Sequence, residues 1–123
     1  MMCKYELQVL DNTNNPTYAD GFAGAVYGEN PPLWDSSRAS GEWNYYDIEW
    51  KRPVFAADGS LQSPAKVTSW LNGIKVQDGF ELTGPTEHQM RLPYIAHAEK
   101  LPLMLQNHGQ TVKYRNIWVV PEE

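Results

Sequence analysis

Three polar side chains near the start of the chain could bind or transform a ligand rich in hydroxyl groups. Glu6 and Gln8 are two positions apart in the alternating run 5–9, and Asp11 follows just after it. Residues two apart share one face of a strand, so Glu6 and Gln8 could present donors and acceptors together, with the Asp11 carboxylate at the rim. A simply solvated face of an antiparallel strand would also carry polar residues there. The pattern leaves both interpretations open.

A second candidate group lies in the run 105–109. Gln106 and His108 would share one face if this run is extended. Imidazole is the usual general acid or base near neutral pH, which makes His108 a candidate for proton transfer. An exposed histidine at a strand end is the competing interpretation, and we favour it more strongly for His88 and His97, which lie in a polar segment.

Metal and cofactor sites have little support in the residue spacing. The three histidines form no H-x-H or H-E-x-x-H pattern, and no calcium-loop spacing occurs. A divalent ion is therefore only weakly supported, and no cofactor is predicted. Cys3 is the single cysteine, which excludes an internal disulfide and a thiolate metal cage, and a nucleophilic role for it is not favoured.

Aromatic residues are the third notable feature. The chain has five Trp and seven Tyr, more than one core commonly uses. Trp43, Trp50 and Trp118 lie in strand-like runs and are predicted to belong to the core. Tyr18 and Trp34 lie in turn-rich segments, where an exposed ring could stack on a sugar face, although singly exposed aromatic residues are also common.

Short strands are the elements expected to position these residues. Period-two alternation or strand-forming residues mark the runs 5–9, 46–50, 66–70, 74–77, 101–106 and 112–120. Asn72-Gly73 predicts a hairpin, because both central positions of a type I′ turn need a positive φ. Nine Gly and nine Pro separate the runs, and no amphipathic-helix or βαβ pattern is present, so the chain is predicted to be all-β. The polar segment 83–100 is expected to be a long loop, either functional or disordered.

Composition restricts the class of protein further. The 123 residues fit one domain, 1–123, and 41% hydrophobic with 20% charged residues is ordinary for a chain with a core. The net charge of −5, with no basic stripe, argues against a nucleic-acid partner. No apolar run approaches the roughly 18 residues of a membrane span, and the first residues lack the apolar region of a signal peptide. The sequence therefore predicts either a cytoplasmic protein or a mature or shortened form of a longer protein, with no membrane partner.

Seven ordered motifs cover nearly the whole chain: 5–11, 15–21, 23–28, 41–44, 82–86, 101–109 and 114–118. In this order they closely resemble the 3-keto-disaccharide hydrolase family. The resemblance implies a concanavalin-like jelly-roll β-sandwich that acts on 3-keto-glycosides, and it suggests a periplasmic or secreted location.

The chemistry that the resemblance implies is elimination. A ketone at C3 acidifies the C2 proton, so a base can abstract it and expel the C1 aglycone, after which water adds. We predict His108 or Glu6 as the base, and Asp11 as a third catalytic candidate that stabilises the sugar. The residues predicted to hold the substrate are Gln8, Gln106, Arg115, Tyr18 and Trp34.

Three departures from the family pattern keep other functions open. Many relatives have His where this chain has Leu71, and Asp where it has Asn107. Loss of titratable groups is compatible with a non-catalytic carbohydrate-binding module, or with a shortened, inactive member that assembles as an oligomer. The 5–11 motif also follows several earlier strands in the family, so this sandwich is expected to lack N-terminal strands. Exposed apolar faces and edges then predict a homodimer.

Overall fold

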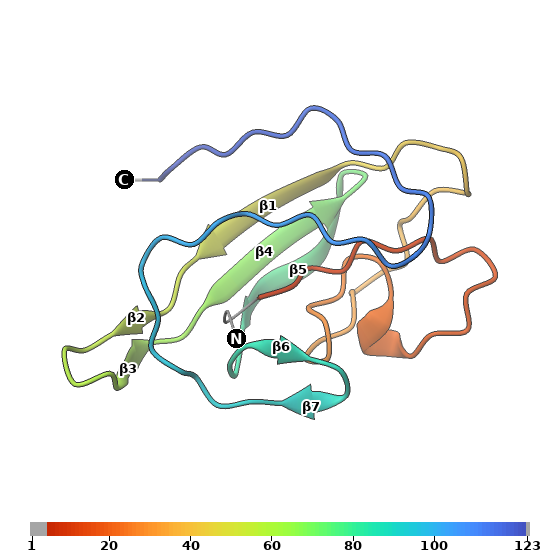
Figure 1. Cartoon of the computed structure of the whole chain (residues 1–123). Helices are drawn as coiled ribbons and strands as arrows, with labels where there is room; N and C mark the ends of the chain where they lie inside the picture. The colour runs from red at the N-terminus through yellow and green to blue at the C-terminus, as the bar shows by residue number, and fades with distance from the viewer. Residues whose placement is uncertain (1–4, 123) are drawn as a thin grey trace.

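Short antiparallel strands make up almost all the regular structure of the computed structural model, which describes residues 5–122 (Figure 1). The central sheet has three strands in the order β1-β4-β5: β1 (Tyr46–Lys51), β4 (Lys66–Leu71) and β5 (Ile74–Glu81). Two small hairpins flank it: β2 (Val54–Phe55) with β3 (Leu61–Ser63), and β6 (Thr86–Glu87) with β7 (Met90–Arg91). Helical structure within these residues is limited to the 3₁₀ turn η1 (Ala19–Gly21), and none of it is long and apolar enough to cross a membrane. Cys3 lies outside the described residues.

The hairpin between β4 and β5 forms where the Asn-Gly dipeptide predicts it. Asn72 has φ 53° and Gly73 has φ 80°, the two positive angles that a type I′ turn requires. The turn pairs Leu71 with Ile74. β1 pairs with β4 along its whole length, so the predicted strands 46–50, 66–70 and 74–77 are confirmed.

The run 5–9 is extended, and it pairs with residues 24–27 instead of joining the central sheet. Backbone hydrogen bonds run from Gln8 N to Ala25 O (2.9 Å) and from Tyr27 N to Glu6 O (3.1 Å). Tyr5 and Leu7 pack against a buried cluster, as the alternation predicts. The members of this cluster are Val26, Ala65, Val67 and Leu82, and a second cluster holds Ala23, Leu71 and Val76. The opposite face of the run therefore carries Glu6 and Gln8 away from these apolar clusters.

The predicted strands 101–106 and 112–120 are wrong for this chain. No strand forms beyond β7 in the described residues, and all residues from 98 to 122 are exposed. Figure 1 shows this segment, in blue, as a long trace that doubles back on itself. Strand-forming residues form a strand only when a neighbouring segment completes their backbone hydrogen bonds. Among the described residues, no segment pairs in this way with residues 98–122.

The prediction that three tryptophans belong to the core is also wrong. Trp43, Trp50 and Trp118 are 42%, 40% and 74% exposed. Trp50 lies on β1, whose residues after Tyr46 are all exposed, and the Tyr5 ring, 5.2 Å away between centroids, covers it only in part. Trp43 precedes this strand, and Trp118 lies in the exposed C-terminal segment.

The segment 83–100 contains a hairpin, so the expectation of a long loop is corrected. Contacts at Glu6 and at Gly28 help to fix the β6–β7 hairpin to the rest of the chain. Glu6 N donates to Thr86 Oγ1 (3.0 Å). Gly28 has φ +70°, and a methyl group added there would lie 1.9 Å from the Glu87 carbonyl oxygen. Only glycine allows this close approach, which brings the hairpin turn against Tyr27.

The core is partly polar. Gln77, on β5, is fully buried, and its Nε2 donates to the carbonyl of Gly24 (3.0 Å) while its Oε1 accepts from Asn30 Nδ2 (2.9 Å). These bonds tie the 24–30 segment to the sheet, and that segment in turn pairs with the run 5–9.

We predict that Gln77→Met lowers the free energy of unfolding by about 1–3 kcal/mol, because methionine keeps the side-chain shape but leaves buried partners unsatisfied. Denaturant titration followed by tryptophan fluorescence measures the change. Asp78→Asn is the matched control on the next position of β5, where an exposed ion pair with Lys75 (3.0 Å) contributes less than about 1 kcal/mol. Equal destabilisation by the two variants would contradict this role for Gln77.

Candidate functional site

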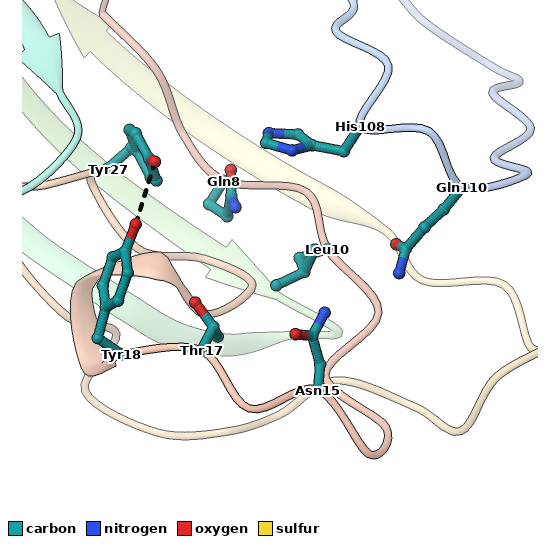
Figure 2. A pocket seen from close by; sticks show the side chains of 8 residues that line it. All are labelled: Gln8, Leu10, Asn15, Thr17, Tyr18, Tyr27, His108 and Gln110. Carbon is teal, nitrogen blue, oxygen red and sulfur yellow. Dashed lines mark hydrogen bonds between the residues drawn. The ribbon is translucent and has the colours of Figure 1, made fainter.

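A hollow of about 230 Å³ lies where the run 5–10, the 15–18 turn and the 108–110 turn meet. Its lining residues are Gln8, Leu10, Asn15, Thr17, Tyr18, Tyr27, His108 and Gln110. Figure 2 shows the two tyrosine rings on one side, His108 and Gln110 on the other, and Gln8 and Leu10 between them. Most of the lining side chains can donate or accept hydrogen bonds, which suits a polar ligand of about one sugar ring. We call this hollow the pocket.

A second hollow, of about 410 Å³, is lined by side chains of residues 106–114 alone. A single exposed segment builds it, and no packed element supports it. The pocket, by contrast, combines segments that are far apart in sequence, and we take it as the candidate site.

Gln8 is the one lining residue of the pocket that is buried. Its side chain is 3% exposed, and Nε2 donates to the carbonyl of Gly21 (3.2 Å). Its own carbonyl accepts from Gly24 N (2.9 Å) and from the Tyr46 hydroxyl (3.0 Å). An amide NH₂ has two donors, so one can hold the side chain while the other serves a ligand.

His108 reaches the pocket from the exposed C-terminal segment. A tight turn positions it: Gly109 has φ +78°, and its N–H donates to Asn107 Oδ1 (2.8 Å). His108 Nε2 lies 4.0 Å from Glu6 Oε1 and 3.2 Å from Gln106 Nε2. At this distance the Glu6 carboxylate attracts a protonated imidazole. The Asn107 side-chain oxygen is thus the acceptor that holds this turn.

Tyr18 and Tyr27 form the opposite side of the pocket, and both contact the His88 imidazole, which does not line it. The hydroxyls of Tyr18 and Tyr27 are 3.2 Å apart, and His88 Nδ1 lies 3.0 Å from the Tyr27 hydroxyl. The same nitrogen makes a short hydrogen-bond contact with the Tyr18 hydroxyl, and the Tyr18 and His88 rings meet edge to face. Burial, reinforced by Tyr18 and by the Glu6 and Glu87 carboxylates, raises the pKa of Tyr27 above the usual range of a phenol.

The structure brings together some of the predicted site residues. Gln8, Tyr18 and His108 line the pocket, and Glu6 stands beside His108 with its side chain mostly covered. His88 is exposed at the turn between β6 and β7, in agreement with the prediction, and it also contacts both tyrosine hydroxyls. The lining residues that the sequence did not indicate are Leu10, Asn15, Thr17, Tyr27 and Gln110. Leu10 could have been found, since it continues the face of Glu6 and Gln8.

Other predicted site residues do not line the pocket. The Asp11 carboxylate accepts hydrogen bonds from the Ser40 hydroxyl and from Thr13 N (2.9 Å), and these bonds lower its pKa. Trp34 is exposed on another turn. Gln106 lines the second hollow, and the Arg115 guanidinium lies over the Trp43 ring at 3.8 Å from its centroid.

Metal ligands are not grouped in the part of the chain that the structure describes. No three His, Cys, Asp or Glu side chains there are placed to hold an ion together. The chemistry open to the pocket residues themselves is proton transfer by His108 and the tyrosines, together with hydrogen bonding by amides and hydroxyls.

Comparisons with known proteins give a family model and a solved structure that resemble this chain. The family model of a 3-keto-alpha-glucoside-1,2-lyase-like domain matches residues 1–120. No curated protein matches the sequence. A solved structure from Parabacteroides distasonis ATCC 8503, titled a "putative glycosyl hydrolase", is 40% identical with a TM-score of 0.69, over 76% of this chain and 39% of that chain.

The likeness to the solved structure confirms the predicted all-β fold of the jelly-roll class. This chain spans less than half the length of that protein. The family match covers nearly every residue, including all seven motifs recognised in the sequence. The chain belongs to the 3-keto-alpha-glucoside-1,2-lyase-like family.

Proposed function

We propose that the pocket binds a 3-keto-glycoside and that the chain takes part in cleaving its bond between C1 and the aglycone oxygen. The observation that carries the proposal is the meeting of His108, Gln8 and Tyr18 in one pocket, with Glu6 4.0 Å from the His108 ring. Membership of the lyase-like family and the likeness to a glycosyl hydrolase support it.

His108 is the proposed base. The C3 ketone makes the C2 proton acidic, and neutral imidazole can abstract it. The electron pair then forms the C1–C2 double bond as the C1–O bond breaks, and the aglycone oxygen takes up a proton. Glu6 would stabilise the imidazolium that forms. Water adds to the resulting enone in a separate step, which completes the hydrolysis.

Gln8 is the proposed donor to the sugar. Negative charge develops on the C3 oxygen as the C2 proton leaves, and a fixed N–H donor near that oxygen stabilises the charge without reorganisation. The Gln8 amide meets this need because its side chain is already held by Gly21. Removal of such a donor from other enzymes slows catalysis by about 10²–10³-fold.

Sugar binding without turnover is the second candidate function. Leu71, at a position where many relatives carry His, is buried against Ala23 and Val76 in the core. The position therefore offers no titratable group to the pocket. A chain that keeps Gln8 and its neighbours but lacks this group could hold a sugar without converting it.

We predict that His108→Ala lowers kcat on a 3-keto-disaccharide by about 10²–10⁴-fold, the usual contribution of a general base. Substrate affinity should change little, because other side chains make most of the polar contacts. Product release measured by chromatography and affinity measured by calorimetry separate the two quantities.

Trp34→Ala is the control for this experiment, since Trp34 is exposed and does not line the pocket. It should leave both kcat and affinity unchanged. Full activity of His108→Ala would contradict the base assignment. Binding by the unaltered chain with no product would select the non-catalytic function.

We also propose that the chain forms a homodimer. Apolar side chains of the C-terminal segment are largely exposed: Leu103, Met104, Ile117, Trp118, Val119 and Val120. The outer edge of β1 has no strand partner among residues 5–122. Exposed edges and apolar patches of this kind favour pairing with another chain.

Size-exclusion chromatography with light scattering should give the mass of a dimer. Trp118→Glu, which places a charge in the apolar segment, should shift the protein toward the monomer, whereas Lys113→Glu should not. A soluble, stable monomer of the unaltered chain would contradict the proposal.

A further inference from the structure

In the proposed elimination one proton leaves C2, and another must reach the departing aglycone oxygen. The side of the pocket opposite His108 can supply this proton. We propose that Tyr18 gives this proton to the departing aglycone oxygen and that His88 positions Tyr18 and restores its proton. The inference rests on the proposed function and adds to it a proton path from solvent.

The geometry singles out Tyr18 as the donor. It lines the pocket, and its hydroxyl contacts both the Tyr27 hydroxyl and His88 Nδ1. Figure 2 shows Tyr18 and Tyr27 with their hydroxyls directed toward each other, across the pocket from His108. A base on one side and an acid on the other is the arrangement that elimination requires, because one proton leaves C2 as another arrives at the aglycone oxygen.

Tyr27 keeps its proton and therefore donates. Its pKa is raised above the usual range by burial, and the nearby Tyr18, Glu6 and Glu87 act in the same direction. A phenol that stays protonated can stabilise negative charge on its neighbour's oxygen. The Tyr18 phenolate formed after proton donation would thus be held by the Tyr27 O–H and by the N–H of His88.

The protons balance over one turnover. Tyr18 loses its proton to the aglycone oxygen as the C1–O bond breaks, and His88 Nδ1–H returns a proton to the phenolate. His88 is exposed on the β6–β7 turn, so its other nitrogen can take up a proton from water. His108 releases the C2 proton to solvent on its own side. No oxidant, reductant or metal enters this sequence.

The β6–β7 hairpin keeps His88 in place. Close contact at Gly28 and the bond from Glu6 N to Thr86 Oγ1 fix the hairpin against the segments that carry the tyrosines. His88 N also donates to Glu87 Oε1 (2.9 Å), which orders the turn. The imidazole is therefore held by packing that does not depend on the sugar.

Two 3-keto-glucosides with different leaving groups test the inference. Methanol is a poor leaving group that needs a proton, whereas 4-nitrophenolate departs without one. We expect Tyr18→Phe to lower kcat about 10²–10³-fold on the methyl glycoside and less than about 5-fold on the nitrophenyl glycoside. His108→Ala should slow both, because C2 deprotonation is common to them.

His88→Ala tests the positioning role. It should show the same dependence on the leaving group, and because His88 is exposed, added imidazole should restore activity on the methyl glycoside. Imidazole should not rescue Tyr18→Phe. Tyr45→Phe, which removes a hydroxyl outside the pocket, should behave as the unaltered chain, and thermal unfolding of each variant reports whether it folds.

The outcomes separate this inference from the proposed function. If the unaltered chain converts both glycosides but Tyr18→Phe slows them by the same factor, the relay is overturned and the function stands. Failure of imidazole to rescue folded His88→Ala overturns the role of His88. If the unaltered chain converts neither glycoside, the proposed function fails and the relay fails with it.

Discussion

The pairing of residues 6–8 with residues 24–27 is the interaction on which the candidate site depends. It closes the core over Tyr5 and Leu7, and the alternation of the strand then points Glu6 and Gln8 the other way. The same ladder sets the position of Tyr27, because its N–H donates to the Glu6 carbonyl (3.1 Å). One short ladder thus places groups that serve both sides of the pocket, and a shift of one residue would exchange its core and pocket faces.

Buried polar groups join segments of this chain that a larger apolar core would hold together by packing. Gln77 joins β5 to the 24–30 segment, and Glu29, also buried, accepts from Thr83 N (2.9 Å) and from the Thr83 hydroxyl (3.1 Å). The Glu29 carbonyl accepts from Arg91 Nη2 (2.7 Å). Such bonds are directional, so they fix the register of short segments that have few apolar contacts.

Sequence reasoning succeeded where the cause is local. The positive φ values at Asn72 and Gly73 follow from residue type, and the alternation of the run 5–9 correctly predicts that Tyr5 and Leu7 face the core, although Val9 is exposed. It failed for 101–120, because strand propensity cannot supply the neighbouring backbone that a strand needs. The site shows the same division. Residue type and spacing pointed to Gln8 and His108, which line the pocket, whereas the contact of His88 with two tyrosines depends on how a hairpin packs at Gly28.

The two sides of the pocket differ in what holds them. Gln8, Tyr18 and Tyr27 belong to paired and packed segments, whereas His108 belongs to an exposed segment without a backbone ladder. Local opening requires little free energy where exposed backbone has few such bonds. Binding of a ligand that bridges Gln8 and His108 would therefore also order the C-terminal segment. The affinity for such a ligand and the local stability of residues 98–122 would then be thermodynamically linked.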